Sequence, residues 1–175
     1  ENLLPNSGFD VWSNSTLVNA QSGAAPVTSG ANSALTNNLL TNGGFDSATS
    51  SWSATNSSIA SASGGQTGNC LEITRSSGSA QYAQQGTITV VAGKLYQLGV
   101  YVKSGTSGDE AYLLRVWDGS AYIVGETGTS SGSWVLVTHV FEATTAAATI
   151  ELWKNSASAG TMLFDTITLY EVIPG

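Results

Sequence analysis

From residue 70 onward, apolar and polar residues alternate with a period of two, which is typical of β-strands buried on one face. In YQLGVYVKS (96–104), for example, Tyr96, Leu98, Val100 and Val102 share one face. Similar runs, rich in β-branched and aromatic residues and separated by Gly, Ser, Asn or Asp, lie at 70–76, 81–91, 110–119, 121–127, 133–143, 148–156 and 161–172. This spacing predicts an all-β fold, an antiparallel β-sandwich of the jelly-roll type.

One segment has superficial helical character. EATTAAATIELW, residues 142–153, contains three consecutive alanines. Its threonines and the strand pattern that follows them favour a loop leading into a strand. We find no amphipathic helix of three turns.

The chain contains one phrase twice: NLLPNSGFD at 2–10 and NLLTNGGFD at 38–46, identical at seven of nine positions. Residues 11–37 have few large apolar side chains, no basic residue and no sustained period. We therefore divide the chain into an extended N-terminal arm, 1–37, and a jelly-roll domain, 38–175. The first copy could instead belong to a preceding domain of a tandem array, but residues 11–37 lack the strands of a second domain.

The arm carries apolar groups that need burial. If it pairs along the sheet edge or groove of a neighbouring subunit, backbone hydrogen bonds would supply affinity. We expect assembly, as a homo-oligomer or with other proteins, through Leu3, Leu4, Phe9, Val11 and Trp12. The alternative for Trp12 is that it folds back onto its own domain.

Composition narrows the class of partner. Only 10% of residues are charged, but 41% hydrophobic content with five Trp argues for a folded chain. The net charge of −7 disfavours nucleic acid and anionic membranes as partners. No apolar run approaches the ~20 residues needed to span a bilayer, and one cysteine permits no internal disulfide.

Several phrases resemble the jelly-roll carbohydrate-binding modules attached to xylanases and cellulases, a fold also found in phage tail fibres and capsid decorations. The opening NLLTNGGFD followed by a Trp is similar to that family's Asn-Leu-Leu-x-Asn-Gly-x-Phe-Glu start. AQYAQQGTITVVAGKLYQLGVYVKS, GSWVLVTHVFEA and MLFDTITLYEV resemble later family strands, in the expected order. The resemblance covers about residues 38–172 and implies structural roles for Trp52 and Trp134.

The resemblance also implies a structural calcium ion between Asp46 of the opening motif and Asp165 of the closing strand. A hard cation prefers such oxygen ligands. Asp46 stands where the family has Glu, so its reach is shorter. The alternative is that Asp46 caps a turn and Asp165 binds backbone.

A carbohydrate ligand would need aromatic faces for the C–H faces of its sugar rings and polar groups for its hydroxyls. Alternation places such residues opposite the apolar faces of three strands. If these faces line one concave sheet, the platform is Tyr101, Arg115, Trp117 and Trp153. The alternative for Trp117 and Trp153 is packing in the core or at its rim, which the burial preference of Trp favours.

Catalysis has little support in the sequence. His139 is the single histidine, and GTSSG at 128–132 fits Gly-x-Ser-x-Gly without the helix that a nucleophile elbow requires. No carboxylate pair stands out for glycoside hydrolysis. We expect a non-enzymatic virion surface or structural protein, a phage fibre or capsid-decoration component, whose N-terminal arm would bind further copies of the chain or other virion proteins. The alternative is a polysaccharide-binding module of a secreted glycoside hydrolase.

Overall fold

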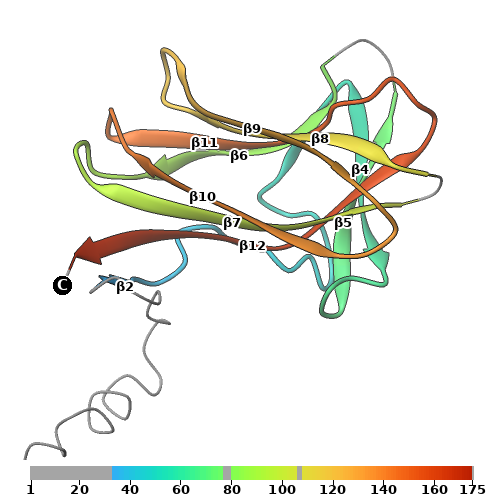
Figure 1. Cartoon of the computed structure of the whole chain (residues 1–175), viewed down its shortest axis with the longest axis horizontal. Coiled ribbons are helices and arrows are strands. Elements are labelled where there is room, and N and C mark those ends of the chain that lie inside the picture. Colours follow the sequence, from blue (N-terminus) through green and yellow to red (C-terminus); the bar gives the residue numbers. More distant parts are fainter. Residues whose placement is uncertain (1–32, 77–79, 106–107, 175) are drawn as a thin grey trace, which may run out of the picture. The chain divides into compact units, whose positions relative to one another are not determined.

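The computed structural model describes residues 33–76, 80–105 and 108–174, which form two antiparallel sheets and no helix. Figure 1 shows β9, β11, β6 and β8 in one layer and β10, β7 and β12 in the other. The prediction of an antiparallel β-sandwich is therefore confirmed. Residues 38–171 form one compact unit, and the described residues 33–37 and 172–174 belong to a second.

The strand order within each sheet follows from the backbone pairing. The six-stranded sheet has the order β10 (Val135–Glu142), β7 (Leu95–Ser104), β12 (Thr161–Pro174), β5 (Asn69–Arg75) and β4 (Ser57–Ser63), with β2 (Ser33–Leu35) paired to the end of β12. The five-stranded sheet has the order β3 (Ser53–Thr55), β6 (Tyr82–Thr89), β11 (Ala147–Lys154), β8 (Glu110–Trp117) and β9 (Tyr122–Ser130).

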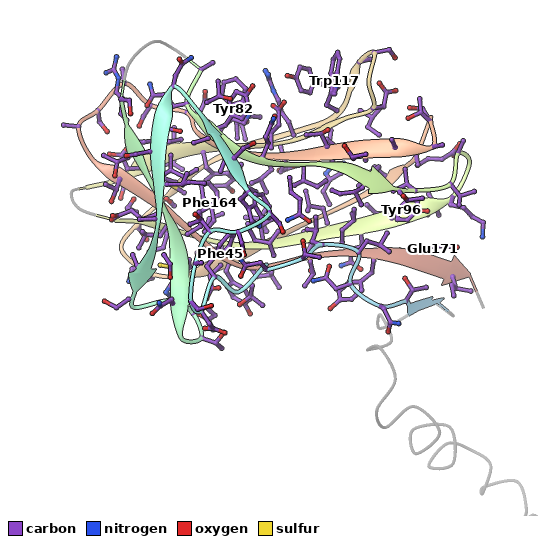
Figure 2. The ribbon with its side chains drawn as sticks, turned by 180° about the vertical axis from the view of Figure 1, so that it is seen from behind. Phe45, Tyr82, Tyr96, Trp117, Phe164 and Glu171 are labelled. Atoms are coloured by element: carbon purple, nitrogen blue, oxygen red, sulfur yellow. The ribbon has the colours of Figure 1, made fainter. Side chains whose placement is uncertain are left out.

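The core lies between the two sheets and is built by the alternation seen in the sequence. On β7, Leu98 and Val100 are at most 1% exposed. Figure 2 shows Phe164 and Tyr96 between the layers. The buried Tyr96 hydroxyl accepts a hydrogen bond from the Val91 amide at 2.9 Å, so its polar atom is satisfied.

The alanine-rich segment is not helical. β10 ends at Glu142 and β11 begins at Ala147, as the strand pattern indicated. A short loop joins the two, because the Thr and Ala residues between them have no buried helical face to stabilise a helix.

The opening motif at 38–46 ties the start of the domain to β12. The Asn38 side chain donates to the Ile167 carbonyl at 3.1 Å and accepts from the Leu169 amide at 2.8 Å. Phe45 is fully buried, and its ring lies 5.5 Å from that of Trp52. The motif therefore closes one end of the core.

The two tryptophans given structural roles by the resemblance pack as follows. Trp52 is 7% exposed, and its indole N–H donates to the Asn42 carbonyl at 3.2 Å. Trp134 is half-buried, with the Lys103 ammonium 5.5 Å from its ring centroid.

Residues 1–32 lie outside the described part of the chain, and so do the predicted arm residues Leu3, Leu4, Phe9, Val11 and Trp12. Among the described residues, no helix is long and apolar enough to cross a membrane.

Candidate functional site

The outer face of the five-stranded sheet carries a group of aromatic and charged side chains. Antiparallel pairing places Arg115 of β8 opposite Glu151 of β11, and Trp117 opposite Thr149. The pairing of β8 with β9 places Trp117 opposite Tyr122 of β9. Directly opposed residues project from the same face, so these side chains gather on the side away from the core.

The rings form a continuous row with a guanidinium in its middle. Trp117 and Tyr122 have ring centroids 4.8 Å apart. The Arg115 guanidinium carbon lies 4.3 Å from the Tyr122 ring centroid and 4.6 Å from that of Trp153. Trp153 in turn stacks on Tyr82 of β6 at 4.5 Å. We call this set the aromatic platform; its members are Tyr82, Arg115, Trp117, Tyr122 and Trp153.

A buried carboxylate fixes the platform from below. Glu151 is 4% exposed; it accepts from the Trp153 indole N–H at 2.7 Å and from the Tyr122 hydroxyl at 3.3 Å. Partial desolvation, followed by the negative charge of Glu151, raises the pKa of Tyr122. The hydroxyl therefore stays protonated and keeps donating to Glu151.

The platform is reachable from solvent although its base is buried. Tyr122 is 45% exposed and Trp117 is half-buried, whereas Trp153 is only 9% exposed. Figure 2 shows Tyr82 and Trp117 projecting away from the space between the two layers. A ligand would therefore meet aromatic rings whose positions are already fixed, so binding would cost little conformational entropy.

The β8–β9 hairpin is fixed at one end of the platform. Asp118 accepts from the amides of Ser120 (2.8 Å) and Ala121 (2.6 Å), and from the hydroxyl of Thr144 in the β10–β11 loop. These hydrogen bonds, that of Thr144 first, lower the pKa of Asp118. The turn beside Trp117 is therefore tied to a neighbouring loop.

Three of the four predicted platform residues lie together, and one does not. Arg115, Trp117 and Trp153 share the outer face of the five-stranded sheet. The grouping of Tyr101 with them is wrong, because Tyr101 lies on β7 of the six-stranded sheet, opposite Leu136 of β10. Alternation gives the face of a residue within its strand but does not say to which sheet the strand belongs.

Sequence reasoning missed Tyr82 and Tyr122. Tyr82 is the first residue of β6, and Tyr122 stands just before an irregularity in the pairing of β8 with β9. The strand register was needed to bring them beside Trp153 and Trp117.

The two acidic residues predicted to bind calcium lie beside the same loop, 64–69. Asp165 is fully buried and accepts from the amides of Thr67 (3.0 Å) and Thr166 (2.6 Å). Burial, with a smaller contribution from the charge of Asp46, raises the pKa of Asp165. A Cβ added at Gly68 would lie 2.1 Å from Asp46 Oδ1, so the loop needs glycine at this position to approach that carboxylate.

The carboxylate oxygens of Asp46 and Asp165 are the kind of ligand that a hard cation prefers. Among the described residues, the ion pairs do not include Asp46 or Asp165. The described residues also contain no group of three or more His, Cys, Asp or Glu side chains that could hold a metal. A cation here would take two carboxylates and would need backbone carbonyls to complete its coordination.

The candidate catalytic residues are not assembled. His139 Nδ1 lies 3.2 Å from Glu126 Oε2 at the edges of the two sheets. Ser130, the serine of GTSSG, is buried at the end of β9, where its hydroxyl donates to the Glu110 carbonyl at 3.2 Å. His139 and Ser130 thus have different partners.

Comparison with known structures places the fold among carbohydrate-binding modules. The xylan-binding module CBM22-1 of Paenibacillus barcinonensis Xyn10C superposes with a TM-score of 0.67 at 18% identity, over 79% of this chain and 97% of that one. TmCBM61, solved with β-1,4-galactotriose, gives a TM-score of 0.61 at 16% identity, over 78% of this chain and 99% of that one.

The fold also occurs in a virus. The enzymatically active domain of bacteriophage CBA120 tailspike protein 4 gives a TM-score of 0.60 at 15% identity, over 77% of this chain but 21% of that one. No curated protein matches the sequence. A family model described as "Carbohydrate binding domain" matches residues 37–158, more than half of the chain. The chain therefore belongs to this carbohydrate-binding domain family.

Proposed function

We propose that this protein is a non-catalytic module that binds a neutral polysaccharide on the aromatic platform. The observation that carries the proposal is the row of rings around Arg115 and Glu151 on one solvent-facing sheet. Sugar rings pack their C–H faces on aromatic rings, and the guanidinium of Arg115 can donate to their hydroxyls, while the buried Glu151 holds the rings in place.

The charge of the platform favours a neutral ligand. The positive charge of Arg115 faces the negative charge of Glu151 on the neighbouring strand, so the formal charges of these two residues sum to zero, and the chain as a whole carries −7. A strongly anionic polymer would be repelled at low ionic strength. Xylan, β-glucan and β-1,4-galactan are suitable first probes, because two of the similar structures are titled for binding xylan and β-1,4-galactotriose.

Replacement of Trp117, a half-buried ring of the platform, tests the site. We expect the full chain to bind at least one of these polysaccharides in affinity electrophoresis, and Trp117→Ala to weaken that binding at least about tenfold. The reason is that an aromatic anchor at a binding surface commonly contributes about 2 kcal/mol or more.

Trp134→Ala is the matched control, because Trp134 lies outside the platform and is likewise half-buried. Its affinity should equal that of the wild type once thermal unfolding has shown both variants to be folded. Equal binding by the wild type and Trp117→Ala would contradict the proposed site, and so would failure of the wild type to bind any probe.

A second candidate function is that of a virion surface component, assembled through residues 1–37. It is supported by the repeated phrase at 2–10 and by the occurrence of this fold in a tailspike protein. Native mass spectrometry should find an oligomer for the full chain and a monomer after removal of residues 1–37. The same mass state for both chains would contradict it. A place outside the cell, on a virion or secreted, suits either function.

We also propose that Asp46 and Asp165 hold a structural Ca²⁺. Binding to the folded state alone would stabilise it by about 2.7 kcal/mol at free calcium about 100 times Kd. The melting temperature should therefore be higher in calcium than in EDTA, and Asp165→Asn should remove the difference. Asp109→Asn, at an exposed turn residue, is the control. No calcium-dependent shift in the wild type would overturn the proposal.

A further inference from the structure

The smaller of two hollows adjoins the aromatic platform at Trp117, and the larger meets the smaller at one residue, Thr87. The smaller, about 170 Å³, lies beside the β8–β9 hairpin and is lined by Thr87, Trp117, Asp118, Gly119, Ala147, Ala148 and Thr149. The larger, about 530 Å³, is lined by Leu39, Thr41, Ser51, Gln85, Gly86, Thr87, Ile88 and Thr89. Thr87 lines both, so the two hollows are neighbours across β6.

A β-bulge in β6 creates this junction. The pairing of β6 with β11 shifts between Ala148 and Ile150, which leaves Gly86 and Thr87 opposite Thr149. Thr87 has a φ of +61°, which is an outlier for a β-branched residue. Ser51, which also lines the larger hollow, has a φ of +74°. Two lining residues of the larger hollow thus have strained backbone.

The opening motif supplies one wall of the larger hollow and is fixed to β6. Gln85 Oε1 accepts from the Thr41 amide at 2.9 Å, and Gln85 Nε2 donates to the Thr41 carbonyl at 2.8 Å. β3 pairs with β6 only at Tyr82, Ala83 and Gln84, so β3 leaves the bulge uncovered. The hollow is therefore a fixed feature of the sheet edge.

The lining of the larger hollow is neutral and rich in hydroxyls. Threonines and a serine dominate it, with Leu39 and Ile88 as its large apolar residues. Its lining residues include no charged or aromatic side chain. Such a surface suits the hydroxyls of an uncharged sugar, and its volume lies within the range of ligand pockets.

We propose that the larger hollow is a second saccharide subsite, joined to the aromatic platform through Thr87 and Thr149. The polymer then crosses the strands from Trp117 over β11 to β6 and continues beyond the edge of the sheet. This inference rests on the proposed function. It adds that the protein recognises an extended stretch of chain interior, bound by stacking at one end and by hydroxyl contacts at the other.

A long, charged side chain at Thr89 should block the hollow without touching the platform. Thr89 is exposed and lines only the larger hollow. The matched control is Thr129→Arg, an exposed threonine on β9 that lines neither hollow. Calorimetric titration of the full chain would use neutral β-1,4-linked xylo-, gluco- and galacto-oligosaccharides of increasing length.

For the wild type and Thr129→Arg, affinity should rise with oligosaccharide length until the hollow is filled. In Thr89→Arg, short oligosaccharides should bind as they bind the wild type, while the longest lose about tenfold, a cost of about 1.4 kcal/mol. The same rise with length in all three proteins would overturn the second subsite and leave the platform intact. No binding by the wild type, or binding that survives Trp117→Ala, would overturn both proposals.

Discussion

At the scale of single residues, the fold buries an ion pair between Lys154 of β11 and Glu110 of β8, 3.3 Å apart and at most 1% exposed. The 155–160 loop completes it: the Lys154 ammonium donates to Ser156 Oγ at 2.9 Å and to the Ser158 carbonyl at 3.0 Å. Burial opposes ionisation of Glu110, but the Ser156 and Ser158 hydroxyls and then Lys154 outweigh it and lower the pKa of Glu110.

This pair predicts a specific pH dependence. Because the pKa of Glu110 is lower in the folded state than when unfolded, its stabilisation is present at neutral pH and is lost as the pH falls below about 4. Glu110→Gln would leave the buried Lys154 ammonium without a counter-charge. It should lower the free energy of unfolding, measured in urea at pH 7, by about 3–5 kcal/mol. The deficit should shrink in acid.

Glu126→Gln is the control, since the Glu126–His139 pair is more than one-third exposed and contributes about 0–1 kcal/mol. Glu110→Gln and Glu126→Gln with the same stability at pH 7 would refute the assignment of this ion pair.

At the scale of elements, the opening motif anchors the domain through a close approach of backbone to backbone. The Gly43 carbonyl accepts from the Ile167 amide at 3.0 Å. A Cβ at Gly43 would lie 2.2 Å from the Ile167 carbonyl oxygen, so only glycine fits. The first copy of the phrase carries Ser7 at this position, and Pro5 where Thr41 donates its amide. Residues 2–10 therefore cannot replace residues 38–46 in these contacts with β12 and β6.

Gly43→Ser should accordingly destabilise the domain by about 3 kcal/mol or more, the range of a severe steric substitution. Gly44→Ser should cost much less, because the nearest atom to its added Cβ is 3.7 Å away. Chemical denaturation of the two variants compares them directly. Equal stabilities would mean that position 43 tolerates a side chain. The first copy of the phrase could then replace residues 38–46, and the motif could be exchanged between chains.

The sheet architecture could be predicted as far as the alternation of buried and exposed side chains along each strand specifies it. The alternation over 96–104 placed Leu98 and Val100 in the core, and the strand pattern after 142 correctly outweighed the three alanines. Side-chain period alone could not assign β7 and β8 to different sheets. For that reason Tyr101 was grouped wrongly, and Tyr82 and Tyr122 were missed.

At the scale of the whole molecule, one sheet face carries the proposed binding site, while the apolar core lies between the two sheets. Glu151 and the rings above it are held by β6, β8, β9 and β11, so ligand binding need not rearrange the core. The hollow at the β6 bulge lies at the border of that face, where the opening motif serves both the fold and the proposed subsite.

The most direct test of the platform is a titration followed through the indole N–H signals of the tryptophans by NMR. With a neutral β-1,4-linked oligosaccharide, we expect the signals of Trp117 and Trp153 to shift. Those of Trp52 and Trp134, which lie outside the platform, should stay in place. Shifts confined to Trp52 or Trp134, or no shift at any tryptophan at saturating ligand, would contradict the account.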